Sequence, residues 1–103
     1  MMKNALVILA GGKGKRFGQK IPKQFLKIGN TNFLNYFISN LDLSSFDIIN
    51  ISIDKKYQNT YFNHKAVSEK IKITYSKPGL TRQISSFNAL KNLKKFKIKN
   101  VLI

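Results

Sequence analysis

The chain has 103 residues, with 19 Lys+Arg against 4 Asp+Glu and no Cys, and its formal net charge at pH 7 is +15. This length allows one domain, and an apolar share of 43% is enough for a core, which excludes a disordered basic tail. The absence of Cys excludes a disulfide framework, a thiolate metal site and a cysteine nucleophile, and no stretch approaches the roughly 20 apolar residues of a membrane span.

Strand and helix patterns alternate along the chain. The apolar run 5–10 predicts a buried strand, and further strands are predicted at 47–54, 71–75 and 100–103. Between the first two strands, 21–28 is expected to be extended or irregular and 29–30 to form a turn. Apolar residues at helical spacing predict three helices, at about 31–41 with Thr31 or Asn32 as cap, 57–69 and 81–93. The expected inward side chains are Phe33, Leu34, Phe37, Ile38 and Leu41 in the first helix, and Ile84, Phe87, Leu90 and Leu93 in the third.

This alternation predicts an α/β fold, a Rossmann-like three-layer sandwich with a mostly parallel sheet. The last predicted strand has no return helix after it. We therefore expect residues 1–103 to be the incomplete N-terminal, nucleotide-binding part of a single domain, truncated after its fourth strand. Ligands of such sheets bind beyond the carboxyl ends of the strands.

The excess of positive charge indicates an anionic partner, such as nucleic acid, a membrane surface or a phosphorylated substrate. Composition bias explains most of it, because Lys accounts for 17 of the 19 basic residues and Asn and Ile are also abundant. A small basic nucleic-acid-binding module is the alternative in a different functional class. The basic cluster 91–99 does not favour it, because its aromatic residues do not alternate with the charges as a stacking surface requires.

A glycine-rich basic loop, LAGGKGKRFG at 9–18, directly follows the first strand. Glycines let the backbone approach a polyphosphate, and the basic side chains supply charge. The loop is not a P-loop, because Gly14-Lys15 is followed by Arg16, and it is not a dinucleotide fingerprint, because Phe17 replaces the last glycine. An ordinary strand-to-helix turn with surface lysines is the alternative for such a loop on its own.

The segment PKQFL at 22–26 follows the glycine loop. Pro22 keeps the backbone around it non-helical. Lys23 can then fold back toward the loop, so that Arg16 and Lys23 would hold one phosphate from two sides.

Three motifs occur in order: A-G-G-x-G-x-R-F-G at 10–18, P-K-Q-F-L at 22–26 and G-x-x-R-x-x-S at 79–85. Together they resemble the nucleotidyltransferase family that activates sugar and polyol phosphates, in its cytidylyltransferase branch, represented by 2-C-methyl-D-erythritol 4-phosphate cytidylyltransferase. The resemblance implies transfer of CMP from CTP to 2-C-methyl-D-erythritol 4-phosphate with release of pyrophosphate, in the non-mevalonate pathway of isoprenoid synthesis. A ribitol-5-phosphate-type cytidylyltransferase shares these motifs and stays open as an alternative.

The resemblance also implies roles for particular residues. Arg16 and Lys23 fall on the catalytic arginine and lysine, and the nucleotide-binding positions are Ala10, Gly11, Gly12, Lys13, Gly14, Gly79, Arg82 and Ser85. Mg²⁺ is implied as cofactor, with its protein ligand expected beyond Ile103 in an H-D-A-A-R-P segment that this chain lacks. We therefore expect the chain alone to be inactive or a poor catalyst. The expected partners are CTP and a polyol phosphate, and neither a membrane nor nucleic acid is expected. The expected location is the cytoplasm. A homodimer of the full-length protein is compatible with the resemblance.

Three other features are expected to be structural. His64, the only histidine, lies between polar residues and is expected to face solvent. Asp54 is expected to close the second strand. Tyr57, Tyr61 and Phe62 are expected to pack a helix rather than to stack on a base.

Overall fold

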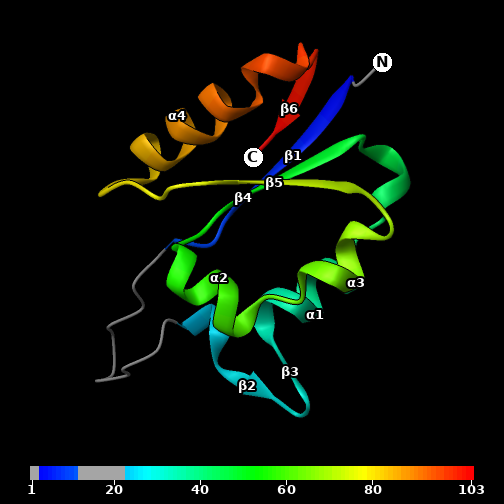
Figure 1. The fold of residues 1–103 in the computed structure, drawn as a ribbon, viewed down its shortest axis with the longest axis vertical. Helices are drawn as coiled ribbons and strands as arrows, with labels where there is room; N and C mark the ends of the chain where they lie inside the picture. Colours follow the sequence, from blue (N-terminus) through cyan, green and yellow to red (C-terminus); the bar gives the residue numbers. More distant parts are fainter. Residues whose placement is uncertain (1–2, 12–22) are drawn as a thin grey trace.

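The computed structural model describes residues 3–11 and 23–103. Its main sheet has four strands in the order β5-β4-β1-β6, and every neighbouring pair is parallel (Figure 1). The strands are β1 (Asn4–Leu9), β4 (Ile48–Ser52), β5 (Lys72–Ser76) and β6 (Asn100–Leu102). Ser52 pairs with Leu9 on one side and with Ser76 on the other, so three strands end level at one edge of the sheet. The predicted parallel α/β class is confirmed.

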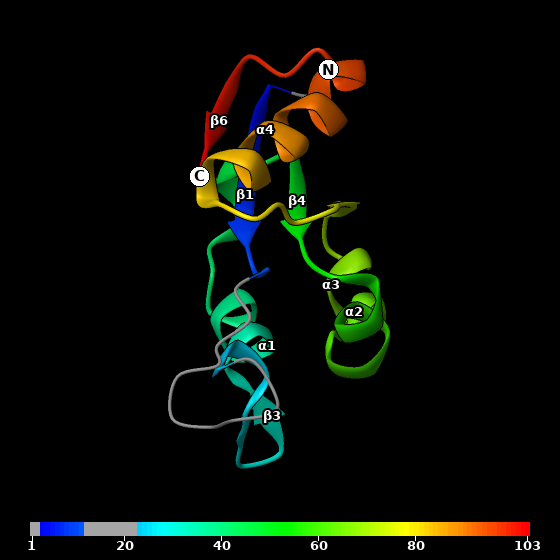
Figure 2. The same ribbon diagram turned by 90° about the vertical axis from the view of Figure 1, so that its left-hand side faces the viewer.

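Helices cover both faces of this sheet. Figures 1 and 2 show α4 (Arg82–Leu93) on one side, and α1 (Phe33–Ser39), α2 (Lys55–Tyr61) and α3 (His64–Ser68) on the other. Because side chains alternate along a strand, the strands feed two cores. Ala5, Val7 and Ile48 pack with Ala89 and Leu93 under α4. The opposite core includes Leu6, Ile49, Ile51, Leu34 and Ile38.

The short elements between β1 and α1 bring the chain back toward the sheet edge. A 3-10 turn, η2 (Lys23–Phe25), precedes a small antiparallel hairpin of β2 (Lys27–Ile28) and β3 (Thr31–Asn32). The hairpin turns at Gly29, whose φ of +61° is left-handed and favours glycine, as the predicted turn requires. Further 3-10 turns are η3 (Leu43–Ser45) and η4 (Lys94–Phe96).

The single helix predicted over 57–69 is wrong, because the structure has two helices there. Phe62 is extended, with φ −98° and ψ 131°, and turns its ring into the core. Asn63 then starts α3 by accepting a hydrogen bond from the Ala66 N–H, at 3.2 Å. Burial of the aromatic ring and a new side-chain cap interrupt the helix.

The predicted inward faces of α1 and α4 are wrong in part. A series spaced by three residues rotates by about 60° per step around an α-helix, so Ile84, Phe87, Leu90 and Leu93 cannot share one face. The sheet side of α4 carries Ser85, Ala89 and Leu93 instead, and Phe87 is 63% exposed. In α1, Leu34 and Ile38 are buried as predicted, whereas Phe33 and Phe37 are exposed.

Candidate functional site

A cavity of about 520 Å³ lies where the segments that follow β1 and β5 meet the start of α4. It is lined by residues of both segments: Leu9, Gly11, Gly79, Leu80, Thr81, Arg82 and Ser85. Four residues predicted to bind nucleotide, from two motifs about 70 positions apart, therefore share one cavity at the carboxyl edge of the sheet. This is the edge at which parallel α/β sheets bind ligands.

Close packing of two glycines shapes the cavity. A Cβ atom on Gly11 would lie 2.2 Å from Pro78 Cβ, so only glycine lets the two segments approach this closely. A Cβ atom on Gly79 would lie 2.1 Å from Ile84 Cγ2. The Gly79 N–H donates to Ser85 Oγ at 2.9 Å, which ties the loop to the first turn of the helix.

The start of α4 makes the cavity favourable to anions. Thr81 caps the helix, its Oγ1 accepting from the Ile84 N–H at 3.2 Å. The helix is twelve residues long, and its N-terminal end carries partial positive charge. Arg82, exposed in that first turn, adds a full charge with a planar set of donors. Among the described residues, none that lines the cavity carries a carboxylate.

Ala10 is buried and does not line the cavity, although its neighbours Leu9 and Gly11 do. Its N–H donates to Ser52 O at 2.8 Å, which extends the pairing of β1 with β4 by one residue. Its carbonyl accepts a hydrogen bond from Gln24 Nε2 at 2.9 Å. The sequence interpretation missed this role of Gln24. The bond joins the P-K-Q-F-L segment to the residue from which the glycine loop departs.

Phe25 anchors the same segment in the core. Its ring is buried and stacks on Tyr57 and Tyr61, with centroid distances of 5.2 and 5.3 Å. These tyrosines therefore pack within the fold, as expected. The backbone of Lys23, at the start of η2, is held next to the end of β1 through Gln24.

The remaining predicted residues lie outside what the structure describes. Gly12, Lys13, Gly14 and Arg16 fall in 12–22, and Lys23 is described by its backbone alone. The proposed joint action of Arg16 and Lys23 on one phosphate stays a prediction.

A buried polar cluster that the sequence analysis did not identify lies at the cavity end of β4 and β5. Asn50, Ser52 and Ser76 are all buried, and the Ser76 hydroxyl donates to Asn50 Oδ1 at 2.9 Å. Within residues 3–11 and 23–103, Ser52 Oγ is buried without a hydrogen-bond partner. The sequence does contain a signal for this cluster. In the predicted strand DIINISID at 47–54, Asn50 and Ser52 are polar residues between isoleucines.

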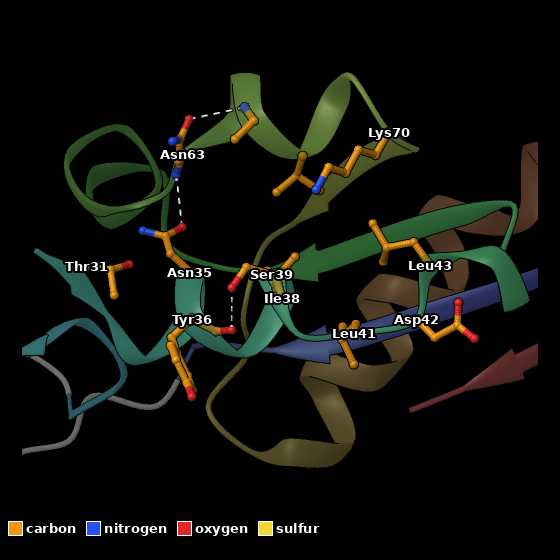
Figure 3. A pocket seen from close by; sticks show the side chains of 12 residues that line it. Thr31, Asn35, Tyr36, Ile38, Ser39, Leu41, Asp42, Leu43, Asn63 and Lys70 are labelled. Carbon is orange, nitrogen blue, oxygen red and sulfur yellow. Dashed lines mark hydrogen bonds between the residues drawn. The ribbon is translucent and has the colours of Figure 1, made fainter.

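A second cavity, of about 470 Å³, shares no lining residue with the first (Figure 3). It separates α1 and η3 from α3 and is lined by residues that include Asn35, Ile38, Asp42, Asn63 and Lys70. Hydrogen bonds from the Ser44 hydroxyl and backbone N–H lower the pKa of Asp42. None of the motif residues that the structure describes lines this cavity.

His64 and Asp54 have local structural roles. Asp54 caps α2 by accepting from the Lys56 N–H at 3.2 Å. His64 is exposed, and its Nδ1 is hydrogen bonded to the Tyr75 hydroxyl. Burial raises the pKa of Tyr75 to about 12, so this phenol is neutral at pH 7.

Residues 3–11 and 23–103 contain no group of three or more His, Cys, Asp or Glu placed to hold a metal ion. None of the helices described has the length and apolar character needed to cross a membrane.

Comparison with known proteins identifies relatives along nearly the whole chain. Residues 4–103 match the model of the family IspD, 2-C-methyl-D-erythritol 4-phosphate cytidylyltransferase. Enzymes of that name from Thermosipho africanus and Chlamydia pneumoniae are 38% and 32% identical over 84% and 90% of this chain, which corresponds to 38% and 41% of their own lengths. A bifunctional IspD/IspF enzyme from Pelagibacter ubique is 34% identical over 99% of the chain and 27% of its own length. The chain thus spans less than half the length of each of these relatives.

Proposed function

Since this chain belongs to the 2-C-methyl-D-erythritol 4-phosphate cytidylyltransferase family, we propose that residues 1–103 supply the nucleotide-binding part of an enzyme that transfers CMP from CTP to a polyol phosphate, with 2-C-methyl-D-erythritol 4-phosphate as acceptor. The observation that carries this proposal is the meeting of Gly11, Gly79, Arg82 and Ser85 around one cavity at the carboxyl edge of the sheet. A ribitol-5-phosphate-type acceptor is the runner-up.

In the proposed reaction, an oxygen of the acceptor phosphate attacks the α-phosphorus of CTP. A new P–O bond forms, the bond between the α-phosphorus and the bridging oxygen breaks, and pyrophosphate leaves with the electron pair. Negative charge accumulates around the α-phosphate, and positioned cations stabilise it without covalent work by the protein. We assign this role to Arg16 and Lys23, and the binding of CTP to Ala10, Gly11, Gly12, Lys13, Gly14, Gly79, Arg82 and Ser85.

The described residues contribute shape and polarity to nucleotide binding. The close approach of Gly11 to Pro78 leaves backbone, rather than side chain, at one wall of the cavity. The hydrogen bond between Gly79 and Ser85 holds the opposite wall, and the N-terminus of α4 presents N–H groups and Arg82. These features suit a polar, anionic ligand such as a nucleotide.

Mg²⁺ is part of the proposal only through the family resemblance. Asp42, Asp47 and Asp54 accept hydrogen bonds from nearby backbone N–H groups, and the described residues that line the cavity include no carboxylate. The described residues of the cavity therefore do not fit a divalent cation by themselves. A metal held mainly by nucleotide phosphates and by residues outside this chain is compatible with them.

The proposal is tested first by calorimetric titration of the 103-residue protein with CTP, UTP, GTP and a DNA oligonucleotide. Preferential binding of CTP is expected. Binding of DNA alone, with affinity falling steeply as salt increases, would favour the basic nucleic-acid module instead.

Turnover is tested in a protein that extends over the length of the family relatives. Pyrophosphate release is measured with CTP and either polyol phosphate. We expect Arg16→Ala and Lys23→Ala to reduce kcat by a factor of 10² or more while the circular dichroism spectrum stays unchanged. Lys65→Ala, at an exposed lysine of α3, is the charge-matched control. Near-normal turnover of either site variant would refute its assigned role.

A further inference from the structure

Asn50 lies in the middle of β4, fully buried, with Ile49 and Ile51 as neighbours in sequence. A buried amide is costly unless it is hydrogen bonded. Both Nδ2 donors are used, toward Thr74 Oγ1 at 3.0 Å and Asn92 Oδ1 at 3.1 Å. The oxygen accepts from the Ser76 hydroxyl at 2.9 Å. One side chain thus joins β4 to β5 and to α4.

Two further side chains of α4 bind the loop that forms the cavity. Asn88 Nδ2 donates to Lys77 O at 2.9 Å, and Ser85 Oγ accepts from the Gly79 N–H at the same distance. Ser85, Asn88 and Asn92 are spaced by three and four residues, so they follow one side of the helix. Hydrogen bonds therefore hold the helix at Ser85, Asn88 and Asn92, and the bond at Asn92 is the one made with Asn50.

Apolar packing alone restrains α4 weakly along the sheet. Its buried apolar contacts come from Ala89 and Leu93, while Ile84, Phe87 and Leu90 are exposed. Apolar contacts are non-directional, whereas hydrogen bonds depend steeply on distance and angle. The polar side chains therefore decide the position of the helix, and with it the positions of Ser85 and Arg82 at the cavity.

We propose that Asn50 is a positioning residue of the nucleotide site: through Ser76 and Asn92 it fixes the end of β5 and the register of α4, and so holds Gly79, Arg82 and Ser85 in place without touching the ligand. This inference rests on the proposed function, because the ligand is the nucleotide assigned there. It differs from a purely structural role, in which loss of Asn50 lowers stability and leaves the cavity intact.

Four variants of the 103-residue protein separate the two roles. Asn50→Leu and Asn92→Leu remove the bonds at similar side-chain size. Asn92→Asp keeps the oxygen that accepts from Asn50 and is the conservative control. Ile38→Ala removes buried apolar contacts on the opposite face of the sheet and is the stability control. Each protein is titrated with CTP, and the hydrogen exchange of the Gly79 amide is measured by NMR under native conditions.

We expect Asn50→Leu and Asn92→Leu to raise the Kd for CTP at least fivefold and to speed exchange at Gly79 at least tenfold. Ile38→Ala and Asn92→Asp are expected to stay within twofold of the wild type in Kd. Leucine variants that match Ile38→Ala in both measurements would overturn the inference. If the wild type does not bind CTP, the proposed function fails, and the exchange at Gly79 still decides the positioning role. If Asn50→Leu does not fold, Asn92→Leu, at a half-buried position, carries the test.

Discussion

Gly11 packs against the ring of Pro78 so closely that a methyl group on Gly11 would lie 2.2 Å from Pro78 Cβ and 2.9 Å from Pro78 Cγ. The two residues belong to segments that follow strands β1 and β5, which are separated in the sheet by β4. Their contact bridges the end of the central strand. It therefore brings Gly11 and the G-x-x-R-x-x-S motif to one cavity.

The destabilising effect of Gly11→Ala should be rescued by Pro78→Gly. Gly11→Ala is expected to cost about 1–3 kcal/mol of unfolding free energy, as overpacking in a close contact does. Pro78→Gly removes Cβ and Cγ, the two carbons that obstruct a methyl group on residue 11. The Cα of residue 78 would lie 3.6 Å from that methyl group, which is an ordinary contact. In the Pro78→Gly background, Gly11→Ala should therefore be nearly neutral. Urea denaturation of the four proteins checks the coupling, and equal costs in both backgrounds would contradict the packing argument.

Gln24 is expected to matter more for CTP binding than its hydrogen bond to the Ala10 carbonyl matters for stability. Gln24→Leu leaves the Ala10 carbonyl without the bond from Nε2, which costs about 1 kcal/mol. It also removes the bond that links the segment carrying Lys23 to the end of β1, so the Kd for CTP should rise several-fold. Gln58→Leu in α2 is the matched control. Titration and thermal denaturation measure both effects, and unchanged CTP affinity in Gln24→Leu would argue against the positioning of Lys23 through this bond.

Substitution by alanine should affect stability differently at Ser52 and at Ser76, which pair across β4 and β5. Ser52 Oγ has no hydrogen-bond partner among the described residues, so Ser52→Ala removes a buried unsatisfied group and should leave stability equal or higher. Ser76→Ala takes the donor away from buried Asn50 Oδ1 and should cost about 1–3 kcal/mol. Denaturant unfolding of the two variants decides the matter. A destabilised Ser52→Ala would mean that this hydroxyl is satisfied in solution, for example by a water molecule.

The carboxylate of Asp47 should make stability dependent on acid pH. It accepts hydrogen bonds from the Asn4 and Lys3 backbone N–H groups, at 2.9 and 2.8 Å, and these bonds lower its pKa from 3.8. A lowered pKa means that the folded state binds the proton less tightly than the unfolded state. The stabilisation is therefore fully present above the unfolded pKa and is lost as pH falls through the folded pKa, below about 4.

The test compares the wild type with Asp47→Asn by urea unfolding between pH 2 and pH 7. The difference in unfolding free energy should be present at neutral pH and should shrink below pH 4. Asp42→Asn probes the other carboxylate with a lowered pKa, at the start of η3. If the unfolding free energies of the wild type and Asp47→Asn differ by the same amount at pH 2 and at pH 7, the carboxylate charge is not the cause of that difference.

The sequence was sufficient to predict the four strands of the main sheet, their parallel arrangement and the helices α1 and α4, because long apolar runs and Gly or Pro breaks mark them. Of the two residues predicted as cap of the first helix, Thr31 and Asn32, the structure shows Asn32 in that role. The side of α4 that faces the sheet was not predicted, since Ser85 and Ala89 pack there through their small size rather than through hydrophobicity. The break at Phe62 depends on a tertiary contact that local periodicity does not contain.

Of the candidate site, the sequence motifs predicted residues that do meet, namely Gly11, Gly79, Arg82 and Ser85. Motif spacing could not reveal the supporting bonds. Gln24 acts through a backbone carbonyl fourteen residues away, and Asn50 through side chains 24 to 42 residues away. Such partners become visible only when the topology brings the strands together.

The exposed apolar side chains of α4 and β6 have a consequence for handling the protein in solution. Strand β6 forms an edge of the sheet, and Leu102 and Phe87 are both more than half exposed. Edge strands with apolar side chains invite intermolecular pairing, while the charge of +15 keeps molecules apart. Added salt screens that repulsion and spares the apolar attraction. Concentrated samples should therefore stay monodisperse longest in buffers of low ionic strength.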